Sequence, residues 1–156
     1  RSGFYRNKAK NIRETARIIT VDHGGEVPRD HKALLALPGV ARKTANLVMG
    51  SAFGMQTGMI VDTHAARISR KLGFTTEKKA PKVEKDLCAT FPQDDWTQTS
   101  HRLILFGRYI CTAKKPHCTR CLINELCPVR EADPEGDWES RGTIWTDAVE
   151  TRTPLK

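Results

Sequence analysis

Four cysteines near the end of the chain have the types and spacing for metal chemistry. Six, two and five residues separate Cys111, Cys118, Cys121 and Cys127. All four thiols fall within seventeen residues, which disfavours four unrelated buried cysteines and predicts a site for one metal ion or one cluster. A structural zinc site usually pairs two C-x2-C turns across a longer loop, whereas each iron of an iron–sulfur cluster takes one ligand and tolerates uneven spacing. Spacing alone favours a cluster only slightly and leaves zinc open.

A second motif, Leu-Pro-Gly-Val-Ala-Arg-Lys-Thr-Ala at residues 37–45, predicts a tight hairpin between two helices because a Pro-Gly pair interrupts the helical pattern. The first N–H groups of the second helix have no partner within it, and the helix dipole favours an anion there. Val40 can anchor the turn while Gly39 lets a DNA backbone approach, and such contacts ignore base sequence. The adjacent cations favour this interpretation over an ordinary helix–turn–helix corner. The candidate DNA-binding residues are therefore Pro38, Gly39, Val40, Ala41 and Arg42.

Charge is distributed unevenly along the chain. The net charge is +8, and residues 131–156 hold three Lys/Arg against seven Asp/Glu, a net of −4, so residues 1–130 carry +12. A net charge of +12 over residues 1–130 points to a polyanionic binding partner more than to a need for solubility. The change to an acidic segment containing Pro and Gly predicts a boundary near residue 131.

The cysteine count and the hydropathy pattern indicate where the protein works. Five cysteines are an odd number, and thiolate ligation requires a reducing compartment. The sequence has no apolar run long enough to span a membrane and no secretory signal. We therefore expect a cytoplasmic protein without a membrane partner. Its 156 residues are enough for one ordinary core, or for two small domains that share one core.

The spacing of apolar residues predicts an all-α fold. Asp62 is a good N-cap, and Pro81 suits the first turn of a further helix. Residues 58–61 could form a short strand, but no other segment alternates in a way that would pair with it. In the last helix we expect residues 103–106 to be buried. The helical ranges are 5–22, 30–37, 41–53, 63–72 and 94–110.

Three motifs in succession resemble one known family. Residues 37–45 are followed by Val61-Asp-Thr-His64 with Arg67, and then by Gly107-Arg-Tyr109 leading into the cysteines. Over residues 1 to about 130 this order resembles the bacterial endonuclease III family, helix–hairpin–helix DNA glycosylases with an iron–sulfur cluster. The resemblance, and not the spacing, decides between the metals: it implies a 4Fe-4S cluster held by the four cysteines.

The resemblance also implies a specific activity. Lys43 matches the family's catalytic lysine, and Asp62 matches its catalytic aspartate. Adenine-specific mismatch relatives lack this lysine, so the chain resembles the bifunctional branch, a base excision repair glycosylase with AP-lyase activity that removes oxidised pyrimidines from duplex DNA. A phosphate-binding lysine and a plain N-cap are the ordinary alternatives for these two residues. We expect the site to favour the neutral amine of Lys43 by desolvation or through a neighbouring cation such as Arg42.

Family architecture implies two lobes. Residues 1–56 would form the second half of a six-helix barrel and residues 57–130 the cluster domain, while 131–156 would be an acidic extension beyond the family's common core. We expect a monomer that works in the cytoplasm, at the bacterial nucleoid. Helices that precede residue 1 in the family are expected to be absent, and they carry much of the base recognition. Lys115 lies at a position that, in the family, belongs to a basic loop in contact with DNA phosphates. Ala41 stands where the family usually has Gly. Arg108 could donate to a cluster sulfur or face an acidic neighbour.

Two further functions stay open at this point. A related glycosylase that acts on mismatched or alkylated bases would share these motifs. A non-catalytic DNA-binding iron–sulfur module would use the hairpin and the cluster only to hold the DNA backbone. Lys43 together with Asp62 argues against the module, because binding alone requires neither residue at its position.

Overall fold

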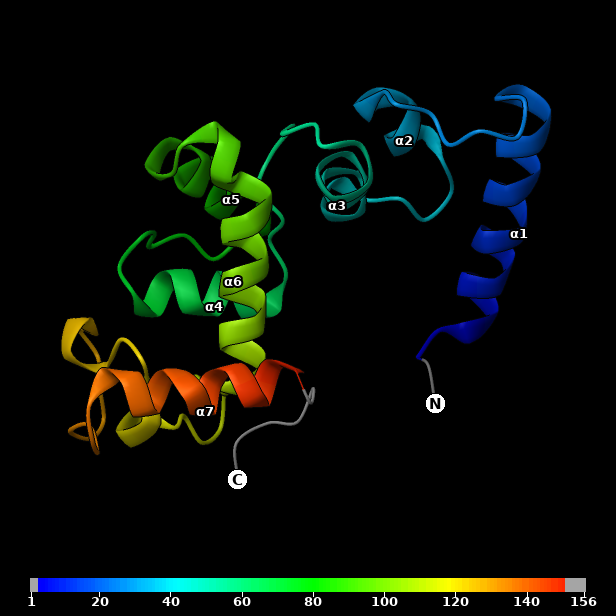
Figure 1. Ribbon diagram of the computed structural model, residues 1–156. Coiled ribbons are helices and arrows are strands. Elements are labelled where there is room, and N and C mark those ends of the chain that lie inside the picture. The colour runs from blue at the N-terminus through cyan, green and yellow to red at the C-terminus, as the bar shows by residue number, and fades with distance from the viewer. Residues whose placement is uncertain (1–2, 151–156) are drawn as a thin grey trace. The chain divides into compact units, whose positions relative to one another are not determined.

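A computed structural model describes residues 3–150 of the chain (Figure 1). This part is helical and contains no strand, which confirms the all-α prediction. The chain divides into two compact units, Arg1–Gly58 and Met59–Lys156. Among the described residues, no helix combines the length and the apolar character that crossing a membrane requires.

The first unit contains three helices, and their bounds agree with the predicted ranges to within about a residue. They are α1 (Tyr5–Asp22), α2 (His31–Ala36) and α3 (Arg42–Phe53). The side chain of Asp30 begins α2 by accepting a hydrogen bond from the Ala33 N–H at 2.7 Å. The buried core of the unit comes from α2, α3 and the residue after α2, and it consists of Leu34, Leu37, Ala45 and Met49.

Helix α1 leaves its apolar face largely uncovered within this unit. The helix has no buried residue, although Ile18 and Ile19 pack against the core. Ile12, which belongs to the apolar stripe predicted from the sequence, is 71% exposed. Burial of the stripe thus needs contacts beyond those that α2 and α3 provide.

The second unit is built around the packing of α4 against α6 (Figure 1). Its first helices are α4 (Thr63–Lys71), α5 (Ala80–Thr90) and α6 (Trp96–Tyr109). At the crossing, a Cβ atom on Gly107 would lie 2.9 Å from Cγ1 of Ile68, so glycine permits the close approach of the two helices. The prediction that residues 103–106 are all buried was wrong, because only Leu103 is buried and the other three are half-buried.

A further helix, α7 (Trp138–Glu150), follows the cysteine region and packs against α6. Asp137 begins it by accepting a hydrogen bond from the Ser140 N–H at 2.9 Å. The sequence analysis did not predict this helix, because the acidic segment lacks a clear apolar stripe. Trp138 is 64% exposed, and the side chain of Trp145 lies outside the described part of the structure.

Candidate active site and iron–sulfur centre

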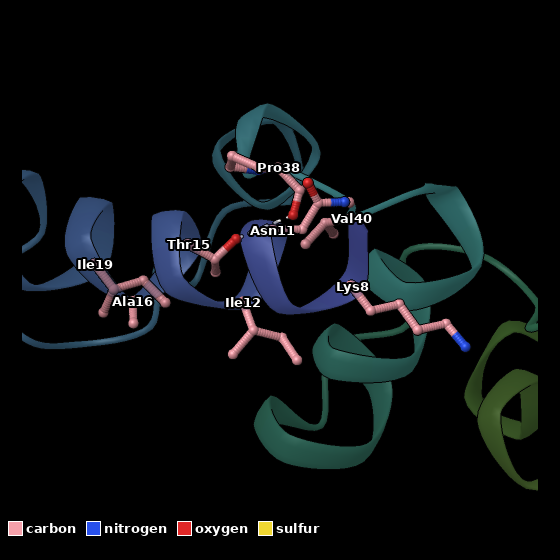
Figure 2. A pocket seen from close by; sticks show the side chains of 9 residues that line it. Lys8, Asn11, Ile12, Thr15, Ala16, Ile19, Pro38 and Val40 are labelled. Carbon is pink, nitrogen blue, oxygen red and sulfur yellow. Dashed lines mark hydrogen bonds between the residues drawn. The ribbon is translucent and has the colours of Figure 1, made fainter. Parts of the chain in front are cut away.

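The hairpin between α2 and α3 is tied to α1 by one hydrogen bond. Thr15 Oγ1 donates to the carbonyl oxygen of Pro38 at 3.0 Å (Figure 2). Within the turn, the Val40 N–H donates to the Leu37 carbonyl at 3.1 Å. An open groove of about 460 Å³ runs beside this contact, lined by the hairpin and by the uncovered face of α1 that carries Ile12. The hairpin therefore has a fixed position relative to α1.

Gly39 is required by the fold as well as by the turn. Its φ is 78°, in the left-handed region, and a Cβ atom there would lie 2.6 Å from Nδ2 of Asn11 on α1. The sequence analysis gave this glycine a role in admitting DNA, and the packing against Asn11 is a reason it missed. Ala41 has φ −91°, so the position needs no glycine, and alanine is compatible with the hairpin.

Lys43 and Arg42 occupy the first turn of α3, directly after the hairpin. Ala41 caps this helix without a side-chain hydrogen bond, and its carbonyl accepts from the N–H groups of Thr44 and Ala45. Both cationic side chains are exposed. Residues 1–58 thus present cations at a helix N-terminus, where anions bind, but they do not desolvate the Lys43 amine.

Asp62 lies in the second unit at the start of α4. Its Oδ1 accepts a hydrogen bond from the Ala65 N–H at 2.8 Å, so it is the N-cap that the sequence predicted. The residues before it are buried, and the Ile60 N–H donates to Ser100 Oγ at 2.9 Å. Asp62 is half-buried, and one backbone N–H holds its carboxylate. Lys43 and Asp62 belong to different units.

Local backbone hydrogen bonds shape the segment that carries the four cysteines. Cys111 follows α6, and its N–H donates to Phe106 at 2.9 Å. Cys118 begins the short turn η2 (Cys118–Arg120), and the Cys121 N–H donates to its carbonyl at 3.1 Å. A second turn, η3 (Asn124–Leu126), lies between the last two cysteines. The Cys127 N–H donates to Asn124 at 3.0 Å, which closes a compact loop from 111 to 127, here called the cysteine loop.

The chemistry of this donor set suits an iron–sulfur cluster. All four thiols are free of disulfides. Burial raises the pKa of Cys121 to about 11, and electrostatic interaction with Cys111, Cys127 and Cys118 acts in the same direction. Four thiolates in one short segment are the donor set that a 4Fe-4S cluster takes.

Two cations of α4 face the first cysteine. Arg67 Nη1 donates to Cys111 Sγ at 3.9 Å, and Nη2 donates to the Gly107 carbonyl at 2.7 Å. Burial raises the pKa of Cys111, and Lys71, one turn further along α4, opposes this rise together with Arg67. Arg108, which the sequence analysis considered as a sulfur donor, is exposed, and the contact comes from Arg67 instead. The spacing of three between His64 and Arg67 places both on the side of α4 that meets Gly107, where His64 Nδ1 donates to the same carbonyl at 3.3 Å.

Lys115 lies in the longest interval between cysteines. Thr112 Oγ1 donates to the Lys115 carbonyl at 2.5 Å and closes a tight turn. Lys114, Lys115 and Arg120 are all exposed in the cysteine loop. The loop thus carries its cations on the surface and its thiols beneath.

Two family models match the chain. The model of the HhH-GPD superfamily base excision DNA repair proteins matches residues 1–93, and that of the iron–sulfur binding domain of endonuclease III matches residues 111–127. The first covers the hairpin and α4, and the second begins and ends at the outermost cysteines of the loop.

Curated relatives agree with both models. Endonuclease III of Bacillus subtilis (strain 168) is 51% identical over 126 residues, which cover 80% of this chain and 57% of the relative. Endonuclease III of Escherichia coli (strain K12) is 46% identical over 129 residues, which cover 83% of this chain and 61% of the relative. The chain spans about three fifths of the length of these relatives.

Solved structures give the same result. A non-covalent endonuclease III–DNA complex and a trapped endonuclease III–DNA covalent intermediate each match with a TM-score of 0.74 and 46% identity, over 81% of this chain and 59% of theirs. A thermostable thymine-DNA glycosylase matches with a TM-score of 0.66 and 31% identity. The helical fold and the iron–sulfur domain are those predicted, and the cofactor is a 4Fe-4S cluster. The chain belongs to the HhH-GPD superfamily of base excision DNA repair proteins and, within it, to the endonuclease III family.

Proposed function

We propose that this chain is the hairpin- and cluster-bearing part of a base excision repair DNA glycosylase with AP-lyase activity. Its substrates are oxidised pyrimidines and abasic sites in duplex DNA. One observation carries the proposal: the exposed Lys43 stands in the first turn of α3, directly after the hairpin, in a chain 46% identical to an endonuclease III trapped in a covalent intermediate with DNA. A lysine amine free to reach a sugar is the group that such a bond requires.

Lys43 is the nucleophile in this proposal. Its neutral amine attacks C1′ of the damaged nucleotide, and the base leaves with the electrons of the glycosidic bond. Loss of a proton from nitrogen and opening of the sugar give a Schiff base, and abstraction of a C2′ proton expels the 3′ phosphate and cuts the strand. Because residues 1–58 leave the side chain exposed, the desolvation that favours the neutral amine comes from bound DNA and from protein outside that unit.

Asp62 supplies a fixed negative charge. Its Oδ1 accepts a hydrogen bond from the Ala65 N–H at the start of α4, where the helix dipole favours a negative charge. The carboxylate can accept the proton of the amine or stabilise the positive charge that develops on the sugar. We assign Lys43 and Asp62 to one catalytic site on the family resemblance.

DNA is held by two backbone-binding elements in this proposal. The hairpin residues 38–42 contact phosphates on one side of the damaged nucleotide, and Lys115 contacts them from the cysteine loop. Cys111, Cys118, Cys121 and Cys127 are the cluster ligands, and the cluster's role is to fix that loop. The protein acts as a monomer in the cytoplasm, on DNA of the nucleoid. The chain has three parts in this proposal: the barrel half is residues 1–56, the cluster domain is residues 57–130, and the acidic extension is residues 131–156.

Borohydride trapping on a duplex with one abasic site tests the proposal. The protein with its cluster and the variants Lys43→Gln and Lys32→Gln are incubated with the duplex. Lys32 is also exposed and lies in the same unit, on α2, so it controls for the loss of a surface charge. We expect a covalent adduct with the protein and with Lys32→Gln, and none with Lys43→Gln. An adduct that persists in Lys43→Gln would contradict the assignment of the nucleophile.

The length of the chain requires a second arm of the experiment. Since the chain spans about three fifths of its relatives, a longer form, extended by the segment that the relatives have before the matched part, is assayed beside it. Duplex binding without any adduct in either protein would support the alternative of a non-catalytic DNA-binding module.

A second function has a specific observation in its favour. The match to a thymine-DNA glycosylase, at 31% identity, extends over 81% of this chain. A mismatched pyrimidine is therefore the competing substrate. Single-turnover excision from duplexes with an oxidised pyrimidine or with a mismatched thymine distinguishes the two, and faster release of the mismatched thymine would replace our assignment.

A further inference from the structure

A buried arginine joins helix α7 to the cysteine loop. Arg141 lies in the first turn of α7 and is 1% exposed. Its Nη2 donates to Glu125 Oε1 at 2.5 Å, and its Nη1 donates to the Gly136 carbonyl at 2.5 Å. Burying a guanidinium is costly unless it is paired and hydrogen-bonded, so these two bonds determine where the first turn of α7 lies.

The acceptor of this ion pair belongs to the cysteine loop. Glu125 is in η3, between Cys121 and Cys127. The residue before it, Asn124, is 1% exposed and donates from Nδ2 to the carbonyls of Cys118, at 2.7 Å, and Ala132, at 2.9 Å. A single short turn thus connects a cysteine backbone, the chain after the loop and the guanidinium of α7.

Two further contacts attach the extension to the loop. The Glu135 N–H donates to the Thr119 carbonyl at 2.8 Å. A Cβ atom on Gly142 would lie 3.5 Å from Leu122 Cδ1, so α7 passes close to that residue. The extension therefore contacts the intervals 118–121 and 121–127, which separate the last three cysteines.

We propose that residues 131–150 form a clamp over the cysteine loop and that Arg141 is its positioning residue. The ion pair with Glu125 keeps the last three cysteines in the arrangement that retains the iron–sulfur cluster. Loss of a cluster requires the loop to open, and a loop attached to a packed helix opens less often. The matched iron–sulfur domain ends at residue 127, so the clamp lies outside it.

Removal of the Arg141–Glu125 ion pair should affect retention of the cluster more than the stability of the fold. Arg141 Nε has no hydrogen-bond partner among the described residues, so the buried cation is incompletely compensated. The Glu125 side chain is 56% exposed and can be solvated when its partner is removed. Arg141→Met should therefore fold, because an apolar residue of similar volume replaces an expensive buried charge. Glu125→Gln is a second variant, which keeps the bond to Gly136 and an acceptor oxygen for Nη2 but removes the negative charge.

The rate of cluster loss tests the proposal. The purified protein with its cluster is mixed with excess iron chelator, the visible absorbance of the cluster is followed, and helix content is recorded by circular dichroism. We expect Arg141→Met to lose the cluster about tenfold faster while the helices remain folded, because a hydrogen bond to a charged group is lost. Glu125→Gln should also lose it faster but to a smaller extent, because its amide oxygen still accepts from Arg141 while the negative charge is gone. The double variant should lose the cluster no faster than Arg141→Met, since both changes act on one interaction.

Arg130→Gln is the matched control, because it removes an exposed ion pair with Asp133 just beyond the loop. Cluster loss at the unaltered rate in folded Arg141→Met and Glu125→Gln would overturn the proposal. Faster loss in Arg130→Gln to the same extent would also overturn it, since the effect would then be one of general charge. The measurement does not use enzymatic activity, so its outcome is independent of the proposed function.

Discussion

Arg67 joins the sulfur of Cys111 to the carbonyl of Gly107 through the two arms of one guanidinium, at 3.9 Å and 2.7 Å. The arginine comes from α4, and both acceptors lie at or just beyond the end of α6. The first cysteine of the loop is thereby oriented from the helix that also carries Asp62. One side chain of α4 thus contacts both the last turn of α6 and the first cysteine.

Replacing Arg67 by lysine should weaken retention of the cluster. A lysine has one ammonium group and no planar fork, so it cannot donate to both acceptors in this geometry. We expect chelator-induced loss of visible absorbance to be about tenfold faster in Arg67→Lys, as for other lost bonds between charged groups. Arg70→Lys is the control, because Arg70 is exposed on the same helix. Equal rates in the two variants would show that Arg67 does not hold the ligand.

Alanine at Gly39 should destabilise the first unit more than alanine at Gly54. Both glycines have positive φ, 78° and 67°, so both substitutions strain the backbone by about 1 kcal/mol. Only at Gly39 does the new Cβ meet another atom, Asn11 Nδ2 at 2.6 Å, which should add about 1–3 kcal/mol. Urea unfolding measures the difference. Equal losses in free energy of unfolding would mean that α1 does not pack on the hairpin as described.

Substitution of Asp62 by asparagine or by alanine should distinguish its role as N-cap of α4 from its proposed catalytic role. Asparagine caps as well as aspartate, so Asp62→Asn should keep the free energy of unfolding while adduct formation with abasic DNA falls at least tenfold. Asp62→Ala should lose about 1 kcal/mol of stability in addition.

Asp30 provides the control for Asp62, since it caps α2 in the same way through Ala33 at 2.7 Å. Asp30→Ala should cost similar stability and leave the rate of adduct formation at the unaltered value. Full adduct formation in Asp62→Asn would reduce Asp62 to a plain N-cap.

Removing the hydrogen bond from Thr15 to Pro38 should weaken DNA binding. Valine has the shape of threonine without the donor, so Thr15→Val frees the hairpin from α1 at a cost of about 1 kcal/mol. We expect the Kd for duplex DNA, measured by fluorescence anisotropy at one fixed salt concentration, to rise about fivefold. Thr20→Val is the control, because Thr20 bonds within its own helix at 2.9 Å. Unchanged affinity in Thr15→Val would exclude the hairpin as a principal phosphate contact.

Local sequence determined the helices and their ends. Pro38 and Gly39, the N-cap Asp62 and the apolar spacing predicted six helices closely, since turn residues and caps act within a few positions of themselves. The four cysteines and the motifs around Lys43 were sufficient to predict the family and its cofactor. Ligand type and spacing predicted a metal site, and the family resemblance decided for the 4Fe-4S cluster.

Only the tertiary structure decided which distant residues meet. The contact of Asn11 with Gly39, the donation from Arg67 to Cys111 and the pairing of Arg141 with Glu125 join positions 16 to 44 residues apart. Helix α7 was missed for the same reason: its weak apolar pattern is compensated by the ion pair of one buried arginine. Such contacts depend on how packed helices cross, and no spacing within a single segment encodes that crossing.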